Sequence, residues 1–492
     1  MAPTNLMRPT KKDWQRQSQS ESEDDDLIGK KDLMPLVISQ VGQNFVPLVV
    51  TMVGLPARGK TVLAYKIQQY LNWTNHKAKV FCVSSYRRKH IESYSSHDLF
   101  RKENSEAAEI RQLSAQEAQD DATKWLQEGG DVAILDGTHI TQARRQTVYD
   151  HFSKVMGFKV LFIECVCDDE MLIEHNVKEV LQFSKDYRYM SAEKALDDFH
   201  HKIEHYMEQH EPMKPKTDGY SYIKYLNAGE MLTTYRLNSP LQSEVLVFVS
   251  NFKPWSKTFY FSRHGESENN VLGRIGGDAD LSVRGRTYAA ALARYFNNEE
   301  RLSSLRVWTS ELKRTQQTAQ GIKAPIEAVP ALNELYAGVC EGLSYEEMQE
   351  KFPQEFAWRD QDKLQYRYPW GESYVDIMAR LKPVLLELEG DTDNLLIISH
   401  QAVLRCLLGY FLNKKHEELP YINVPLHTII KLTLSGYKSK MEVIKLNIEC
   451  VDTYRKQPKN CSVNRSADDA LLTVPAHFEN LSIWNRPPIV QL

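Results

Sequence analysis

Short apolar runs alternate with longer helix-like stretches through the middle of this chain. The first run, residues 46–53, is continuous and of strand length, which is typical of a parallel sheet covered on both faces. Similar runs follow at 80–83, 132–135 and 160–163, and the Ala-, Glu-, Gln- and Leu-rich segment 103–127 predicts a helix. This alternation predicts a doubly wound α/β domain with a parallel sheet over residues 46–251.

A second set of strands and helices follows. Its apolar runs lie at 258–261, 306–308, 394–398 and 429–432, and helices are expected at 289–296 and 373–387. The pattern predicts a second α/β domain over residues 252–454. No internal repeat is apparent, so we expect the two domains to have separate chemistries.

Both ends of the chain lack this pattern. Residues 1–45 are rich in Gln, Ser and acidic side chains with little to bury, which favours a solvated, disordered tail. After about Asp452 the sequence turns to Pro, Asn and Ser, and we expect a poorly packed C-terminal tail over residues 455–492.

Composition narrows the class of protein. The 492 residues carry 61 Lys and Arg against 65 Asp and Glu, and 42% are hydrophobic, which excludes wholesale disorder, collagen and a coiled coil. The near-neutral charge gives no sign of a nucleic-acid binder, and no apolar run approaches the roughly 20 residues of a membrane span. The N-terminus lacks a signal peptide and the seven cysteines form no metal-type pairs, so we expect a cytoplasmic protein with free thiols.

A phosphate-binding loop follows the first strand directly. The pattern G-x-x-x-x-G-K-[ST] is met by Gly54, Leu55, Pro56, Ala57, Arg58, Gly59, Lys60 and Thr61. In such a loop backbone N–H groups approach phosphate oxygens, the lysine reaches the β- and γ-phosphates, and the hydroxyl binds Mg²⁺. The strand before it and the helix expected after it favour a nucleotide site over an ordinary turn.

Asp136 ends another apolar run, at the edge of the sheet where ligands gather in open α/β folds. Its functional interpretation is a ligand to Mg²⁺-bound water in phosphoryl transfer, and the alternative is a cap on the next turn. Nearby arginines could clamp a second, phosphorylated substrate, although each one alone is better explained as a solvated surface charge: Arg87, Arg88, Arg111, Arg144 and Arg145.

The second domain begins with a different phosphate chemistry. The sequence Arg263-His264-Gly265-Glu266 follows a strand, and a histidine there suits nucleophilic attack on phosphorus. His400 follows another strand, so the two histidines are expected to face each other. Arg314 is a further phosphate ligand, and Glu334 is a candidate general acid. Two purely structural histidines are the alternative.

The order and wording of these motifs resemble the bifunctional 6-phosphofructo-2-kinase/fructose-2,6-bisphosphatase family over residues 46–454. Beyond the two sites, the resemblance rests on the stretches 263–268, 273–278, 367–369, 371–374 and 425–428. It implies an N-terminal P-loop kinase half and a C-terminal phosphoglycerate-mutase-like histidine phosphatase half. A plain phosphoglycerate mutase is disfavoured because it does not need the appended phosphate-loop domain.

The resemblance also implies the activities. The kinase half would transfer the γ-phosphoryl group of ATP to the 2-hydroxyl of fructose 6-phosphate with Mg²⁺, and the phosphatase half would hydrolyse fructose 2,6-bisphosphate through a phosphohistidine. Such an enzyme regulates glycolysis and gluconeogenesis. The partners implied are these small molecules and a second copy of the chain in a homodimer, with no nucleic acid and no membrane.

Residue roles follow by motif matching. In the phosphatase His264 is the nucleophile, Glu334 the proton donor, and Arg263, Arg314 and His400 cradle the phosphoryl group. Fructose 2,6-bisphosphate positions are matched by Asn270, Gly276, Tyr345, Arg359, Lys363, Tyr374, Gln401 and Arg405. In the kinase Lys60, Thr61, Asp136 and Asn176 match nucleotide or metal positions, and Arg87, Arg111, Thr138, Arg144 and Tyr206 match fructose 6-phosphate positions. Cys167 matches a kinase-site cysteine, or is simply a buried thiol.

Departures from the family fall mostly in the kinase half. Leu181 replaces a catalytic-site lysine, and Lys178, three residues earlier, offers a conceivable partial rescue. His139 stands in place of Asn, and Lys202 in place of a sugar-phosphate Arg. In the phosphatase Tyr336 replaces an Asp two residues after Glu334, which could alter the pKa of the general acid.

Three hypotheses follow from these departures. The leading one is a bifunctional enzyme with a competent phosphatase and a weakened kinase that still binds ATP. The second is a bisphosphatase whose kinase half is a nucleotide-binding regulatory module. The third is a scaffold with both sites silent, which the complete histidine set disfavours.

Overall fold

The computed structural model describes residues 46–91, 94–297, 304–436, 438–455 and 457. The described residues from Leu48 onward belong to one compact unit. The predicted tail at 1–45 lies outside the described residues, as does most of 455–492.

The first sheet has six strands in the order β2-β3-β1-β4-β5-β6. Its strands are β1 (Leu48–Val53), β2 (Ala78–Cys82), β3 (Val132–Asp136), β4 (Lys159–Val166), β5 (Tyr222–Leu226) and β6 (Met231–Tyr235). Strands β1 to β4 are parallel, as predicted, β5 pairs parallel with β4, and β6 pairs antiparallel with β5. Strands β5 and β6 were not predicted; most of β6 is exposed at the sheet edge, so it lacks the apolar run that marks the others.

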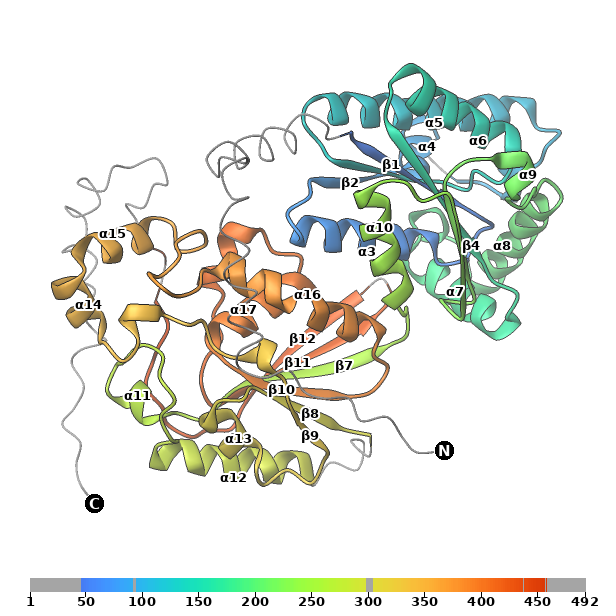
Figure 1. Ribbon diagram of the computed structural model, residues 1–492. Helices are drawn as coiled ribbons and strands as arrows, with labels where there is room; N and C mark the ends of the chain where they lie inside the picture. Colours follow the sequence, from blue (N-terminus) through green and yellow to red (C-terminus); the bar gives the residue numbers. More distant parts are fainter. Residues whose placement is uncertain (1–45, 92–93, 298–303, 437, 456, 458–492) are drawn as a thin grey trace, which may run out of the picture. The chain divides into compact units, whose positions relative to one another are not determined.

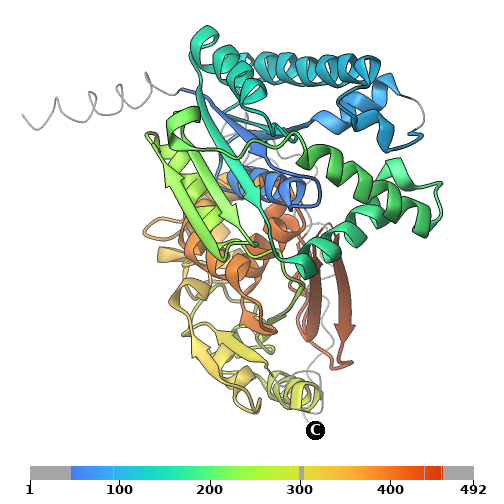
Figure 2. The same ribbon diagram turned by 90° about the vertical axis from the view of Figure 1, so that its right-hand side faces the viewer.

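Helices cover both faces of this sheet (Figures 1 and 2). Leu48 and Val50 of β1 pack with α3 (Lys60–Trp73) and α10 (Pro240–Asn251), whereas Val49 packs on the opposite face with α5 (Ser105–Gln127). Successive strand residues point to opposite faces, so a strand covered on both must be apolar throughout. This is the doubly wound arrangement that the continuous run at 46–53 predicted.

The remaining helices of this half lie in the segments between the strands. They are α4 (Val83–His90), α6 (Gln142–Tyr149), α7 (Glu170–Phe183), α8 (Ala192–Met207) and α9 (Pro215–Asp218). Side-chain oxygens of Thr141, Asp169 and Ser191 cap α6, α7 and α8 by accepting backbone N–H bonds, which fixes where these helices begin.

The second sheet also has six strands, in the order β12-β11-β7-β10-β8-β9. They are β7 (Lys257–Arg263), β8 (Arg306–Thr309), β9 (Ile326–Ala328), β10 (Leu395–Ser399), β11 (Thr428–Ser435) and β12 (Lys438–Lys445). Strands β7, β10, β8 and β9 are parallel, and β11 runs antiparallel to both β7 and β12. The short β9 and the polar β12 were not predicted.

Two helical layers cover this sheet as well. Phe261 and Ile397 pack with α16 (Tyr374–Gly390) and α17 (Gln401–Phe411), whereas Tyr260 and Leu396 face α12 (Val283–Asn297) and α13 (Lys313–Ala319). The other helices are α11 (Glu268–Val271), α14 (Tyr345–Lys351) and α15 (Pro353–Gln361). The sheets lie within residues 48–235 and 257–445, and separate domains meeting near residue 251 remain our proposal.

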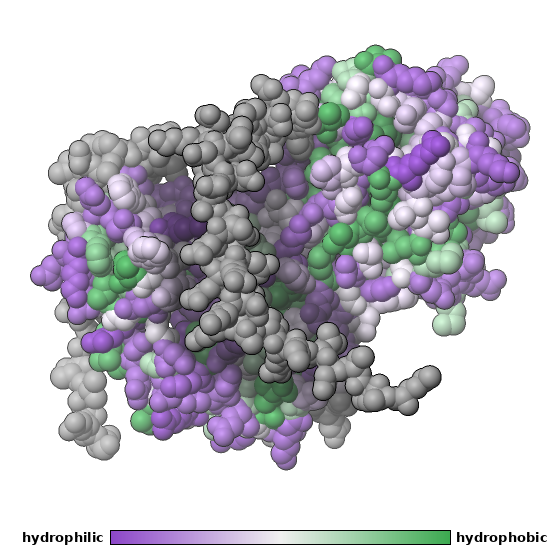
Figure 3. Space-filling model, in the orientation of Figure 1, coloured by the Kyte–Doolittle hydropathy of each residue, from purple (hydrophilic) through white to green (hydrophobic). Residues whose placement is uncertain are grey.

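Among the described residues, no helix has the length and apolar character needed to cross a membrane. The face seen in Figure 3 is mostly hydrophilic over its described part, with small hydrophobic patches between the charged side chains.

Candidate active sites

The phosphate-binding loop joins β1 to α3. Gly54 has φ +130° and donates its N–H to the Thr138 carbonyl at 2.9 Å, and a Cβ there would lie 2.4 Å from the Cys165 carbonyl oxygen. Only glycine fits that position. Gly59 caps α3 at φ +75° without a side-chain acceptor, so the first N–H groups of α3 remain available to an anion.

Lys60, Thr61 and Asp136 meet at the mouth of this loop. The Thr61 hydroxyl donates to Asp136 Oδ2 at 2.9 Å, and the Lys60 ammonium donates to the Leu55 carbonyl. Burial lowers the pKa of Lys60 to about 8 and raises that of Asp136, although the Cys82 thiol and Lys60 act against the rise. A hydroxyl beside a carboxylate is a donor pair that suits Mg²⁺, whose other ligands in nucleotide sites are phosphate oxygens and water.

A cavity of about 570 Å³ opens beside these three residues. It is lined by all five predicted fructose 6-phosphate residues, which are Arg87, Arg111, Thr138, Arg144 and Tyr206. The structure therefore brings the predicted sugar-phosphate group and the phosphate loop to one cavity at the carboxyl ends of the strands.

Asp186 is a cavity residue that sequence reasoning missed. It accepts hydrogen bonds from the buried Arg87 and, at 3.4 Å, from Arg88. Burial acts to raise the pKa of Asp186, but Arg87, Lys202 and Arg88 together outweigh burial and the pKa is lowered. A substrate phosphate that binds Arg87 must share this guanidinium with a carboxylate already in place.

Asn176 and Cys167 lie on the other side of the phosphate loop, in a smaller cavity of about 80 Å³ that Arg58 and Gly59 also line. The Asn176 amide donates to the Ala57 carbonyl at 3.2 Å, and Arg58 Nε donates to the Cys167 carbonyl at 3.1 Å. Burial raises the pKa of the Cys167 thiol, which therefore lacks the thiolate character of a nucleophile.

The two phosphatase histidines lie side by side, as predicted. His264 follows β7 and His400 follows the neighbouring β10, and their ring centroids are 5.1 Å apart. Both rings are buried, with 3% and 0% exposed. His264 Nδ1 lies 2.7 Å from the Gly265 carbonyl oxygen, to which it donates, so the lone pair resides on Nε2. His400 Nε2 lies 2.7 Å from the Ser310 hydroxyl.

Charge and burial keep both rings neutral. The pKa of His264 is lowered well below its usual value, first by burial and then by Arg314 and Arg263. The pKa of His400 is lowered by burial and Arg314 in the same way. A neutral Nε2 beside two guanidinium groups is the arrangement a phosphorus nucleophile requires.

The two arginines are held by backbone carbonyls. Arg263 Nη1 donates to the Val424 carbonyl at 3.2 Å and to the Thr453 hydroxyl at 2.7 Å, and its buried Nε has no partner among the described atoms. Arg314 Nη1 donates to the Gly277 carbonyl at 2.6 Å. The remaining N–H groups are those a phosphoryl group would use.

The Glu334 side chain lies at the N-terminus of α17, the helix that begins directly after His400. Its carboxylate accepts the N–H groups of Leu335, Gln401 and Ala402 at 2.9, 3.2 and 3.3 Å. These bonds hold the carboxylate in the cavity that His264 also lines, which is the place that the predicted general acid would occupy.

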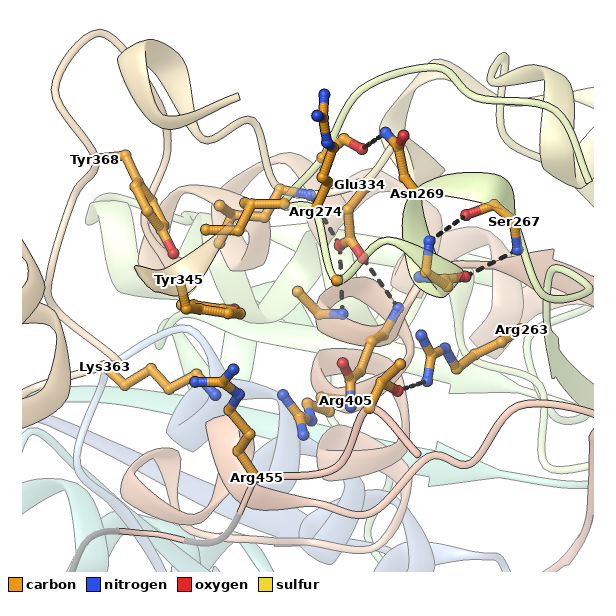
Figure 4. A pocket seen from close by; sticks show the side chains of 18 of the residues that line it. Arg263, Ser267, Asn269, Arg274, Glu334, Tyr345, Lys363, Tyr368, Arg405 and Arg455 are labelled. Carbon is orange, nitrogen blue, oxygen red and sulfur yellow. Dashed lines mark hydrogen bonds between the residues drawn. The ribbon is translucent and has the colours of Figure 1, made fainter. Parts of the chain in front are cut away.

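The rest of the predicted bisphosphate group lines the same cavity, which has a volume of about 190 Å³ (Figure 4). It includes Asn270, Gly276, Tyr345, Arg359, Lys363, Tyr374, Gln401 and Arg405. Their guanidinium groups are fixed by phenols: Arg359 donates to Tyr345 and Tyr368, and Arg405 to Tyr374. Tyr368 and Arg274 were missed, although both belong to stretches that carried the resemblance.

The expectation of a poorly packed tail after Asp452 was wrong for its first residues. Asp452, Thr453 and Arg455 line the phosphatase cavity. This segment is held by polar contacts with residues far away in the sequence rather than by an apolar run, so no periodic pattern marks it.

The comparisons agree with this pair of sites. A family model described as 6-phosphofructo-2-kinase matches residues 38–255, and one described as histidine phosphatase superfamily (branch 1) matches residues 259–447. The bifunctional 6-phosphofructo-2-kinase/fructose-2,6-bisphosphatase of Aquarana catesbeiana is 48% identical over 88% of this chain and 92% of its own length. The chain belongs to this family.

A second curated relative fits the same assignment. The human enzyme 6-phosphofructo-2-kinase/fructose-2,6-bisphosphatase 1 is 47% identical over 88% of this chain and 91% of its own length. Among solved structures, the alpha-ribazole phosphatase from Shigella flexneri is 23% identical and covers 40% of this chain and 100% of its own, with a TM-score of 0.36. Family membership makes this chain an enzyme with a kinase half and a histidine phosphatase half.

The structure shows what the residues that depart from the family pattern contact in the kinase half. Leu181 packs against an apolar cluster that contains Ala57 and Phe199, so its side chain supplies packing where the family has a charge. Lys178 is exposed and pairs with Glu174 at 2.8 Å, which turns it toward solvent and gives no support to the suggested rescue.

Lys202 and His139 both line the kinase cavity. Lys202 lies over the rings of Phe100 and Phe199, and burial lowers its pKa to about 7. His139, at φ +41°, bonds the Met52 carbonyl oxygen through Nδ1 at 2.8 Å, and burial lowers its pKa to about 4. His139 is therefore neutral and holds the turn after β3.

Tyr336, the departure in the phosphatase half, has a mostly exposed side chain. Its backbone N–H donates to Glu372 at 3.0 Å, and no hydrogen bond joins it to Glu334 within the described part of the chain.

Proposed function

We propose that this chain hydrolyses fructose 2,6-bisphosphate to fructose 6-phosphate in the His264 cavity and makes it from fructose 6-phosphate and ATP in the cavity beside the phosphate loop. The observation that carries the phosphatase proposal is a neutral, buried His264 with a second histidine at 5.1 Å and Arg263 and Arg314 beside it. Kinase activity is supported by one cavity that joins Lys60 and Asp136 to all five sugar-phosphate residues.

The phosphatase reaction divides into two displacements. In the first, His264 Nε2 attacks the 2-phosphorus, the N–P bond forms as the bond to the sugar oxygen breaks, and Glu334 protonates that oxygen. In the second, water attacks the phosphohistidine, its proton passes to Glu334, and inorganic phosphate leaves with Nε2 neutral again. Arg263, Arg314 and His400 bind the equatorial oxygens, where charge accumulates in the transition state.

In the kinase half the phosphate loop would hold the nucleotide and Lys60 would neutralise the β- and γ-phosphates. Mg²⁺, when bound by Thr61 and Asp136, supplies charge neutralisation and orientation of the phosphates. Asn176 and Cys167 would contact the nucleotide from the smaller cavity. The sugar phosphate would be clamped by Arg87, Arg111 and Arg144, with Thr138 and Tyr206 lining its place.

A weak kinase is part of this proposal, because Leu181 carries no charge and Lys178 points to solvent. The alternative, a bisphosphatase with a nucleotide-binding regulatory module, is favoured by the same two side chains. We expect ATP binding in both cases, since the phosphate loop is complete.

Separate assays of the purified chain test these proposals. Fructose 2,6-bisphosphate labelled at the 2-phosphate should leave acid-labile label on the wild type and none on His264→Ala. ATP-dependent phosphorylation of fructose 6-phosphate should be slow but measurable. Absence of phosphohistidine would refute the phosphatase mechanism, and absence of kinase turnover with retained ATP binding would establish the alternative.

We also propose a homodimer and a cytoplasmic location, both on family resemblance. Light scattering of the purified chain should give twice the protomer mass of 56.9 kDa. Cell fractionation should leave the protein with the cytosolic fraction.

A further inference from the structure

The segment that follows β12 lines the phosphatase cavity with Asp452, Thr453 and Arg455. Glu266 accepts the backbone N–H of Val451 at 2.8 Å, Arg263 donates to the Thr453 hydroxyl, and the Tyr454 hydroxyl lies 3.3 Å from the Tyr421 carbonyl oxygen, to which it donates. Three contacts within four residues fix this backbone beside the catalytic arginine. These contacts therefore also fix the position of the next residue, Arg455.

Arg455 points into the cavity. Its guanidinium carbon lies 3.8 Å from the centroid of the Tyr345 ring, and Figure 4 shows it next to Lys363. The side chain is half-buried, and burial together with Arg359 lowers its pKa. Within the described residues it has no ion pair with a carboxylate and no hydrogen bond to a protein acceptor. A guanidinium desolvated in this way is open to an anion.

The charges around Arg455 are mostly of its own sign. Arg359, Lys363 and Arg405 line the same end of the cavity, and the ion-paired acid among them is Asp360, which Arg359 binds at 3.1 Å. The pKa of Lys363 is lowered well below its usual value by burial, by Arg405 and Arg359, and to a smaller extent by Arg455. Two acids, Asp360 and Glu346, act on Arg455, so four basic side chains against two acids leave this end with an excess of positive charge. Such an excess costs free energy unless a polyanion neutralises it.

This end of the cavity is separate from the reacting end. Arg263 and Arg314 are the cations that act on His264, whereas Arg455 acts on Lys363. In Figure 4 Arg263 lies on one side of Arg405, and Tyr345, Lys363 and Arg455 lie on the other. A ligand whose reacting phosphoryl group sits on His264 and which carries a second phosphate can reach this second group of cations.

We propose that Arg455 is a substrate-binding and specificity-determining residue of the phosphatase, which contacts the phosphate group that does not react. The Tyr345 ring stacks on the Arg455 guanidinium. The contacts of Val451, Thr453 and Tyr454 position Arg455 beside the cavity. The proposal rests on the proposed phosphatase function. It assigns the first residues after the last strand to the catalytic unit and gives them a role in selecting a doubly phosphorylated sugar.

The test compares two substrates that differ in this phosphate alone, with the full-length chain. For fructose 2,6-bisphosphate, Arg455→Ala should raise KM by about ten- to a hundredfold, as for loss of one charged contact, with kcat changed far less. For fructose 2-phosphate the same variant should behave as wild type. Arg455→Lys should recover part of the loss. Arg286→Ala, which removes an exposed arginine of α12, is the charge-matched control and should change neither substrate.

Three results would overturn the proposal. Equal losses on both substrates would indicate a general structural role, unchanged kinetics would remove Arg455 from the site, and a rise in kcat would make the segment an inhibitory cover. Calorimetric titration of fructose 2,6-bisphosphate into His264→Ala and His264→Ala/Arg455→Ala gives the affinity without turnover. This separates a failure of the proposed reaction from a failure of the proposal for Arg455. Only the second failure leaves the two variants with equal affinities for fructose 2,6-bisphosphate.

Discussion

The imidazole rings of His264 and His400 lie 5.1 Å apart at an interplanar angle of 52°. Their strands, β7 and β10, are adjacent and parallel, so both residues leave the sheet at the same edge. Both rings are buried, and Arg314 and Arg263 lie beside them. The resulting low pKa of His264 means that its neutral form, which the proposed mechanism requires, persists at pH values well below the ordinary pKa of histidine.

This arrangement predicts the acid side of the pH profile. Burial contributes most to the low pKa of His264 and Arg314 contributes next, so Arg314→Met should raise that pKa. The midpoint of the acid limb of kcat/KM should then move to higher pH. The rate at the optimum should also fall by about a hundredfold, because one phosphoryl contact is lost. Steady-state kinetics from pH 4.5 to 8 measure both. An acid limb that stays in place would contradict the assignment.

Leu181→Lys should raise kinase turnover. The leucine packs beside Ala57 and Phe199, and its neighbour Val180 lines the kinase cavity, so a lysine needs only to extend along that wall. A new cation near the transferred group can add about 3 kcal/mol of transition-state stabilisation, or roughly a hundredfold in rate. Lys178→Ala is the control, and it should leave the rate unchanged because that side chain pairs with Glu174 in solvent. No gain with Leu181→Lys would mean that the missing charge is not what limits the kinase.

His139→Asn should flatten the pH dependence of stability. The folded pKa of His139 is about 4 and its unfolded value is about 6.5, so between these values the unfolded chain binds more protons and stability falls as the pH falls. From pH 7.5 to 5 this amounts to about 2 kcal/mol. Asparagine accepts the positive φ of this position. Urea denaturation at the two pH values should show a smaller difference in the free energy of unfolding for the variant than for the wild type. An equal difference in the two proteins would mean that another group titrates.

Glu389→Gln should destabilise the chain. The buried carboxylate binds Lys66 and the Tyr410 hydroxyl, each at 2.8 Å, and lies 3.7 Å from Lys257. Breaking a buried ion pair costs about 3 kcal/mol or more, because charges are left without a partner. The urea midpoint should drop accordingly. Glu418→Gln, at the exposed pair with Lys414, should not move it. Equal midpoints for both variants would show that the buried pair adds nothing.

The strands and the residues at their ends could be predicted because burial on both faces forces a continuous apolar run. Asp136, His264 and His400 each follow such a run, and all three lie in or beside the two cavities. By contrast, β6 and β12 have exposed faces and mixed composition, so they resemble loops in the sequence.

The contacts that were missed are those made by long-range pairing of polar groups. Asp186 meets Arg87 across 99 positions, and Thr453 meets Arg263 across 190. No local spacing encodes such pairs, since only the folded chain brings them together. The solvent-facing direction of the Lys178 side chain could not be predicted for the same reason, because it depends on which side of α7 packs against α8.

The backbone bond from Val451 to Glu266 and the hydroxyl bond from Thr453 to Arg263 have a consequence for biosynthesis. A ribosome releases the phosphate loop and its sheet long before it adds these residues, and domains generally fold as they emerge. The second cavity is thus finished only after residues 451–455 have been added. A nascent chain gains its nucleotide-binding surface first and completes the cavity around His264 only after the last strand of the second sheet has been made.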